Sequence, residues 1–199
     1  MAVPYHERQV GSLCAVHATN GLLGKQVYQA KDFDAIEKEL GIPREGPRTI
    51  LQKACNFIEV CFRCKTPNNV QGNYDANVLM VALLKEGVTM KFWDARNKNS
   101  TALLTALKSP DCIGCVVNVQ GFFSNFFGLC FGENGHWVAV KKVCAASGDI
   151  FFNLNSNLRA PSPFNEDKVF ENFILRHLKR EAHVLIATKT SGGSTETRE

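Results

Sequence analysis

The chain has 199 residues, 45% of them hydrophobic, so it is long enough to bury one sizeable core, and we expect a single soluble globular protein. Its 23 basic and 19 acidic residues are scattered, without the Lys/Arg stripe of a nucleic-acid-binding protein, so nucleic acid is not an expected partner. The N-terminus does not resemble a signal peptide and no apolar run reaches the ~18 residues of a membrane span, so we expect a cytoplasmic or nuclear protein whose eight cysteines stay reduced.

The first half of the chain has mainly helical periodicity. Ser12 is a good N-cap for a helix that reaches about Leu23, where Gly24 ends it, so that Cys14 falls in the first turn. Further helices are predicted at Asp32–Leu40 and Asp75–Glu86, with an apolar segment of mixed signals at Arg48–Phe62.

The second half is mainly extended. Strands are predicted at Val88–Trp93, Cys112–Val119, His136–Val143, Asp149–Ser156 and Ala182–Ala187, and helices at Ser100–Lys108 and Glu166–Lys179. The third and fourth strands are separated by a short turn and predict an antiparallel hairpin. Helices followed by adjacent strands predict an α+β domain with helices packed on an antiparallel sheet, over residues 1–189, and a disordered polar tail at 190–199.

Cys14 lies where a helix begins, so free backbone N–H groups and the positive end of the helix dipole favour its thiolate. This position suits a nucleophile. The alternative is that Cys14 is a small core residue, as many intracellular cysteines are. The first interpretation requires a base nearby.

Two histidines are candidates for this base. His17 shares a helix face with Cys14, but a pair built on one helical turn leaves little room for a substrate carbonyl, so we interpret His17 as a supporting or core residue. His136 opens a strand directly after a long loop, which places its ring at the edge of a cleft. Its second nitrogen needs an acceptor, and the adjacent strand offers Asn153, Asn155 and Asp149, among which the pattern does not choose.

Gln9 lies just upstream of Cys14 and is a candidate for oxyanion stabilisation, because its side-chain N–H can act beside the backbone N–H of Cys14. The alternative is a solvated loop glutamine. Gln before Cys at a helix start, followed by His and Asn on late neighbouring strands, is the order found in papain-like cysteine hydrolases.

Four segments of the chain carry a more specific resemblance. They are YHERQVGSLCAVHATNGLL, GNYDANVLMVAL, GHWVAV and FFNLNSNLRAP, and in this order they resemble the Josephin family of cysteine deubiquitinases, above all its short single-domain members. The resemblance extends from about Tyr5 to Lys189. It implies a papain-like fold and makes residues 1–189 a Josephin catalytic domain.

The resemblance also implies roles for four residues. Cys14 is the nucleophile, His136 the general base and acid, Asn155 the residue that orients His136, and Gln9 the oxyanion donor. The short members tend to carry Asp at the third position, so Asn155 is closer to the ataxin-type branch and brings no charge to the imidazolium.

The substrate implied is ubiquitin joined through its C-terminal glycine to a lysine amine, with ubiquitin and ubiquitinated proteins as partners and no cofactor. The chain is therefore expected to be a thiol-dependent isopeptidase. The alternative is a ubiquitin-binding module with weak or no turnover.

Two further features lie outside the resemblance. Cys61/Cys64 and Cys112/Cys115 have the half-site spacing of structural zinc, but the pairs are farther apart than the usual 15 to 20 residues. We therefore interpret them as core or loop cysteines, with structural zinc as the alternative and no metal or disulfide assigned. The loop before His136 contains five phenylalanines, at positions 122, 123, 126, 127 and 131. They either fill the core or form a lid that contacts ubiquitin or a membrane.

Overall fold

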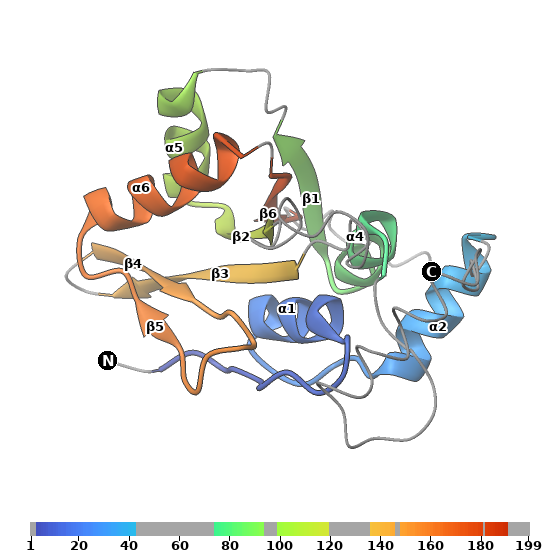
Figure 1. Ribbon diagram of the computed structural model, residues 1–199. Helices are drawn as coiled ribbons and strands as arrows, with labels where there is room; N and C mark the ends of the chain where they lie inside the picture. The colour runs from blue at the N-terminus through green and yellow to red at the C-terminus, as the bar shows by residue number, and fades with distance from the viewer. Residues whose placement is uncertain are drawn as a thin grey trace, which may run out of the picture.

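The structure is a computed structural model (Figure 1), and it describes residues 3–42, 74–93, 99–119, 136–145, 148–180 and 182–190. Its helices are α1 Cys14–Leu23, α2 Ala30–Glu39, α4 Ala76–Lys85, α5 Ser100–Lys108 and α6 Asp167–Leu178. Its strands are β1 Val88–Trp93, β2 Cys112–Val119, β3 His136–Ala145, β4 Gly148–Asn153, β5 Ser162–Pro163 and β6 Val184–Lys189. The predicted segment Arg48–Phe62, the Phe-rich loop and the tail after residue 190 lie outside the described residues.

The strands form one six-stranded sheet in the order β1-β6-β2-β3-β4-β5, and every neighbouring pair is antiparallel. Helices lie on both faces (Figure 1): α1, α2 and α4 share one buried cluster, and α5 and α6 the other. The predicted α+β class with helices on an antiparallel sheet is therefore confirmed.

The central strand β2 is apolar on both of its faces. Val116 packs in the cluster under α1, and the next residue, Val117, packs in the cluster under α5 and α6. Because successive side chains of a strand point to opposite faces, a sheet covered on both sides requires a continuous apolar run and not an alternating one. This explains the run from Cys112 to Val119.

Gly114 permits the close approach of β2 and β3. Its φ is +144°, and a Cβ atom there would lie 2.1 Å from the carbonyl oxygen of Val140. No other residue fits this position without moving the backbone of β3. The pairing of β2 with the part of β3 around Val140 and Lys141 therefore depends on a glycine in β2.

Several predicted boundaries are corrected by the structure. The N-cap of α1 is Leu13 and not Ser12, and its side chain makes no capping bond. Helix α2 begins at Ala30, before the predicted Asp32, because Gln29 and Asp32 form a reciprocal capping box. Strand β4 ends at Asn153, and β6 runs two residues later than predicted.

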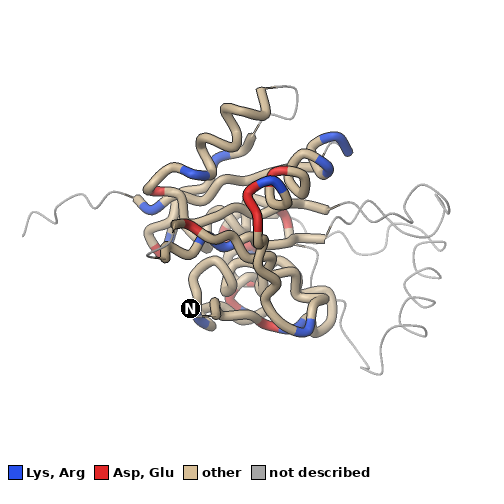
Figure 2. Tube along the Cα trace, turned by 90° about the vertical axis from the view of Figure 1, so that its left-hand side faces the viewer, with Lys and Arg blue, Asp and Glu red and all other residues tan. Residues whose placement is uncertain are grey.

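Charged side chains are distributed widely over the molecule. Figure 2 shows Lys and Arg positions on several separate elements, with Asp and Glu positions among them. In the described part of the chain no helix is both long enough and apolar enough to cross a bilayer.

Candidate active site

Cys14 is the first residue of α1 and is only 5% exposed. Because Leu13 provides no side-chain cap, the first N–H groups of the helix remain available to other acceptors. The backbone N–H groups of Trp137 on β3, of Ala15 and of Cys14 itself stabilise the charged form of the Cys14 sulfur. The thiol therefore lies where the start of α1 meets the start of β3.

The pKa of the Cys14 thiol is subject to two opposing effects. Burial is the larger effect and raises the pKa above its ordinary value, whereas the backbone N–H groups of Trp137, Ala15 and Cys14 lower it. The net direction is upward. The N–H groups at the start of the helix favour the thiolate, as predicted, but burial outweighs them, so a base is needed to remove the proton.

His136 is the first residue of β3, directly before Trp137, whose backbone N–H stabilises the charged form of the Cys14 sulfur. The Nε2 atom of His136 lies 2.8 Å from Oδ1 of Asn155. Of the three acceptors that the sequence offered, the structure brings Asn155 to the ring. Oδ1 of Asn153 instead accepts the backbone N–H of Asn155, at 2.9 Å.

A second hydrogen bond defines which end of the Asn155 amide faces the ring. The backbone N–H of Asn157 donates to Oδ1 of Asn155 at 2.9 Å, so this atom must be the oxygen. Nε2 of His136 is consequently the donor in its contact with Asn155. In neutral imidazole this leaves Nδ1 as the basic nitrogen.

Gln9 is hydrogen-bonded to Ser156, the residue that follows Asn155. Its backbone N–H donates to the carbonyl of Ser156 at 2.8 Å, and its Oε1 accepts the Ser156 hydroxyl at 2.6 Å. Its Nε2 donates to the carbonyl of Gly11 at 2.9 Å. The structure thus ties Gln9 to the turn that carries Asn155.

His17 has a supporting role, in agreement with its interpretation from the sequence. Its Nδ1 lies 2.5 Å from Oε2 of Glu7, and its Nε2 accepts the backbone N–H of Val10 at 3.4 Å. The other oxygen of Glu7 accepts bonds from the Tyr5 hydroxyl at 2.6 Å and the Asn20 amide at 3.0 Å. This carboxylate therefore holds the N-terminal segment, with Gln9 in it, against α1.

The hydroxyl of Tyr5 belongs to the same hydrogen-bond network around Glu7. Burial, together with the hydrogen bond to the Glu7 carboxylate and its charge, raises the pKa of Tyr5 to about 12. Tyr5 consequently remains a neutral donor across the physiological pH range.

Sequence reasoning missed four contributors to this site. Glu7, Ser156 and Asn157 had no distinguishing pattern, and the N–H of Trp137 that lowers the pKa of Cys14 is a backbone group that no residue type reveals. The only sequence signal was their position, since Ser156 and Asn157 directly follow Asn155 in the polar run NSN. Such runs favour turns in which side chains bind nearby backbone groups.

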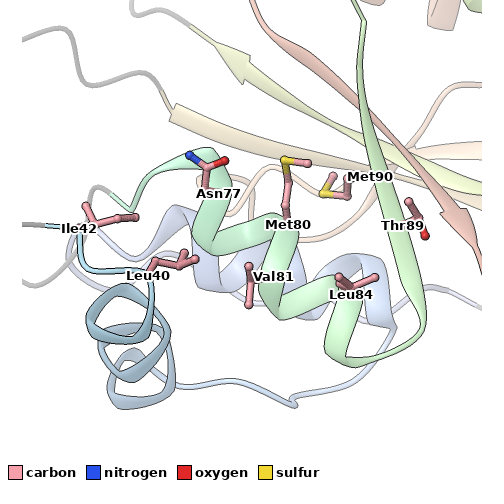
Figure 3. Close-up of a pocket in the computed structure, with 8 residues that line it drawn as sticks. All are labelled: Leu40, Ile42, Asn77, Met80, Val81, Leu84, Thr89 and Met90. Atoms are coloured by element: carbon pink, nitrogen blue, oxygen red, sulfur yellow. The ribbon is translucent and has the colours of Figure 1, made fainter.

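A groove of about 350 Å³ lies apart from these residues, between the end of α2, α4 and β1 (Figure 3). It is lined by Leu40, Ile42, Asn77, Met80, Val81, Leu84, Thr89 and Met90. None of these described side chains is a nucleophile or a general base at neutral pH.

The cysteine pair on β2 has a structural environment. Cys112 and Cys115 are buried in the cluster under α5 and α6, where burial raises the pKa of both thiols. Within the described ranges no group of three or more His, Cys, Asp or Glu residues is arranged to hold a metal ion. Cys61 and Cys64 lie outside those ranges.

These features define an α+β protein of the papain-like class: an antiparallel sheet with helices on both faces, a cysteine at a helix start, and a histidine paired with an asparagine. The chain belongs to the Josephin family, whose family model matches residues 9–188. It is 31% identical to human Josephin-2 over 170 residues, which cover 85% of this chain and 77% of that protein. It is 26% identical to a Josephin-like protein of Drosophila melanogaster, over 92% of this chain and 72% of that one. It is also 24% identical to human Ataxin-3, covering 93% of this chain but 45% of the relative.

Proposed function

We propose that this protein is a cysteine-dependent deubiquitinase that hydrolyses the bond between the C-terminal glycine of ubiquitin and a lysine amine. The observation that carries the proposal is the contact between Nε2 of His136 and Oδ1 of Asn155, at the start of the strand whose next N–H, that of Trp137, lowers the pKa of the Cys14 thiol. A buried thiol becomes a nucleophile only with an oriented base, and this arrangement provides one.

The first half of the reaction forms a thioester. His136 takes the proton of Cys14 through Nδ1, the thiolate attacks the glycine carbonyl, and the oxyanion binds the backbone N–H of Cys14 and the side-chain N–H of Gln9. The C–N bond then breaks, and the imidazolium gives its proton to the departing lysine amine.

The second half releases ubiquitin. Water replaces the lysine amine, His136 takes one of its protons, and the resulting hydroxide attacks the thioester carbonyl. The C–S bond breaks, ubiquitin leaves with a free C-terminal carboxylate, and Cys14 regains a proton. Asn155 keeps the imidazole in one orientation through both halves, because its oxygen binds the ring N–H in either charge state.

A second candidate function is ubiquitin binding with weak or no turnover. It is favoured by the burial of Cys14, which is 5% exposed and has a raised thiol pKa. In that case the cleft would bind ubiquitin without bringing its carbonyl to the sulfur.

One experiment separates the two functions. The protein and its Cys14→Ala variant are each mixed with ubiquitin that carries a C-terminal electrophile, and the intact masses are measured beside cleavage of a ubiquitin–lysine isopeptide. Deubiquitination predicts a covalent adduct and cleavage with the native protein, and neither with the variant. Binding of ubiquitin without adduct or cleavage would establish the second function instead.

A further inference from the structure

Ser156 lies in the turn after β4. It stands between Asn155, which contacts His136, and Asn157, whose backbone N–H donates to the Asn155 side chain. It is 3% exposed, although it carries a hydroxyl. Its Oγ donates to Oε1 of Gln9 at 2.6 Å, and its carbonyl accepts the backbone N–H of Gln9 at 2.8 Å. A buried hydroxyl therefore makes a short hydrogen bond to the side chain of the candidate oxyanion donor.

The hydrogen bonds of the Gln9 amide define its orientation. A 180° rotation of the amide would place Oε1 against the carbonyl oxygen of Gly11, which now accepts a bond from Nε2 at 2.9 Å. Two acceptors would then face each other without a proton between them. With Nε2 toward Gly11, Oε1 accepts the Ser156 hydroxyl proton.

This arrangement leaves one N–H of the Gln9 amide to bind the oxyanion. A glutamine amide has two N–H donors and one oxygen. Among the described residues one donor is bound to Gly11 and the oxygen to Ser156, so a single N–H remains to bind an oxyanion. A donor held in place before the reaction costs no reorganisation when negative charge develops.

We propose that Ser156 is a positioning residue that acts through Gln9 and orients its free amide N–H toward the oxyanion. This inference rests on the proposed function, because it deepens the role of the same site. Asn155 and Ser156 are consecutive: one orients the imidazole of His136, and the next orients the amide of Gln9. A single turn thus positions both the base and the oxyanion donor.

The test is a double-mutant cycle with Gln9→Ala, Ser156→Ala and the double variant, measured on a ubiquitin–lysine isopeptide. We expect Ser156→Ala to lower kcat about tenfold with KM unchanged, less than the 10²- to 10³-fold lost with a whole oxyanion donor. In the Gln9→Ala background, the same change should alter kcat less than twofold. An equal loss in both backgrounds would overturn the proposal, because Ser156 would then act independently of Gln9.

A matched control is Thr19→Ala, which removes another buried hydroxyl, bound to the carbonyl of Ala15 at 2.9 Å within α1. It should lower Tm without reproducing the coupling to Gln9. This comparison separates a general loss of stability from a change in positioning.

A second readout does not depend on turnover. The two side-chain amide protons of Gln9 are followed by NMR, and in Ser156→Ala we expect their exchange with water to accelerate at least severalfold. Unchanged exchange would overturn the proposal even if kcat fell. If the native protein did not cleave the isopeptide, the proposed function would fail, and the exchange measurement would still decide whether Ser156 positions Gln9.

Discussion

Replacement of Asn155 tests the orientation of the imidazole directly. Asn155→Ala removes the acceptor that lies 2.8 Å from Nε2 of His136. A hydrogen bond to a charged group contributes about 1.5–3 kcal/mol, and the ring carries its charge in the transition state. Since about 1.4 kcal/mol corresponds to a factor of ten in rate, kcat should fall by about 10- to 160-fold.

Asn155→Asp has the opposite electrostatic consequence. A carboxylate accepts the same two hydrogen bonds, from His136 and from the backbone of Asn157, and it adds a negative charge beside the ring. This charge favours the protonated imidazole, and His136 must lose its proton to act as the base, so the acidic limb of the kcat/KM profile should move upward by about one pH unit or more. Activity should be retained on the alkaline side of that limb.

Both variants are assayed with a fluorogenic ubiquitin substrate between pH 5 and 10. Asn99→Ala is the matched control, because Oδ1 of Asn99 also accepts a backbone N–H, from Ala102, but at the start of α5 on the other face of the sheet. It should lower stability without lowering kcat. If Asn155→Ala retained native kcat within twofold, or if Asn155→Asp left the acidic limb in place, the assigned role of Asn155 would be refuted.

Three further outcomes are expected. Gly114→Ala should destabilise the protein by at least about 3 kcal/mol in denaturant titration. The control Gly148→Ala should cost only about 1–2 kcal/mol, because φ there is +120° but a Cβ meets no heavy atom within 4 Å. Equal losses would contradict the clash with β3. Lys142→Ala should lower the free energy of unfolding by about 2–3 kcal/mol, because this buried ammonium binds the carbonyl at the end of α5 at 2.6 Å. Lys85→Ala should lower it by less than about 0.5 kcal/mol, because the ion pair of Lys85 is exposed. Because burial raises the pKa of Cys14, its alkylation by iodoacetamide, mapped by mass spectrometry, should accelerate as pH rises above 8; a maximal rate already at pH 6 would show a preformed thiolate.

Local signals in the sequence were sufficient for much of the fold. Gly24 and Gly87 occupy positions with φ of +77° and +72°, as helix-ending glycines do, and β1, β2 and α5 have the predicted bounds. The N-cap of α1 was misassigned because Ser12 has the right residue type. A side-chain cap there would compete for the N–H groups that lower the pKa of Cys14.

The site was only partly accessible to the same reasoning. Cys14 and His136 stand at the starts of elements, which a sequence pattern can indicate. Asn153 and Asn155 could not be separated by strand periodicity, because β4 ends at Asn153 and Asn155 lies in the turn beyond it. The bond between Ser156 and Gln9 joins residues 147 positions apart, a distance over which no local pattern carries information.

The place of β6 in the sheet has a consequence for biosynthesis. It is the last of the described strands in chain order, yet it lies between β1 and β2 and pairs with both. Until it emerges from the ribosome, β1 has no partner strand and β2 has one bare edge beside an apolar face, which is the kind of edge on which nascent chains aggregate. A chain interrupted before Val184 would carry every candidate catalytic residue and still lack the strand that joins the two parts of the sheet.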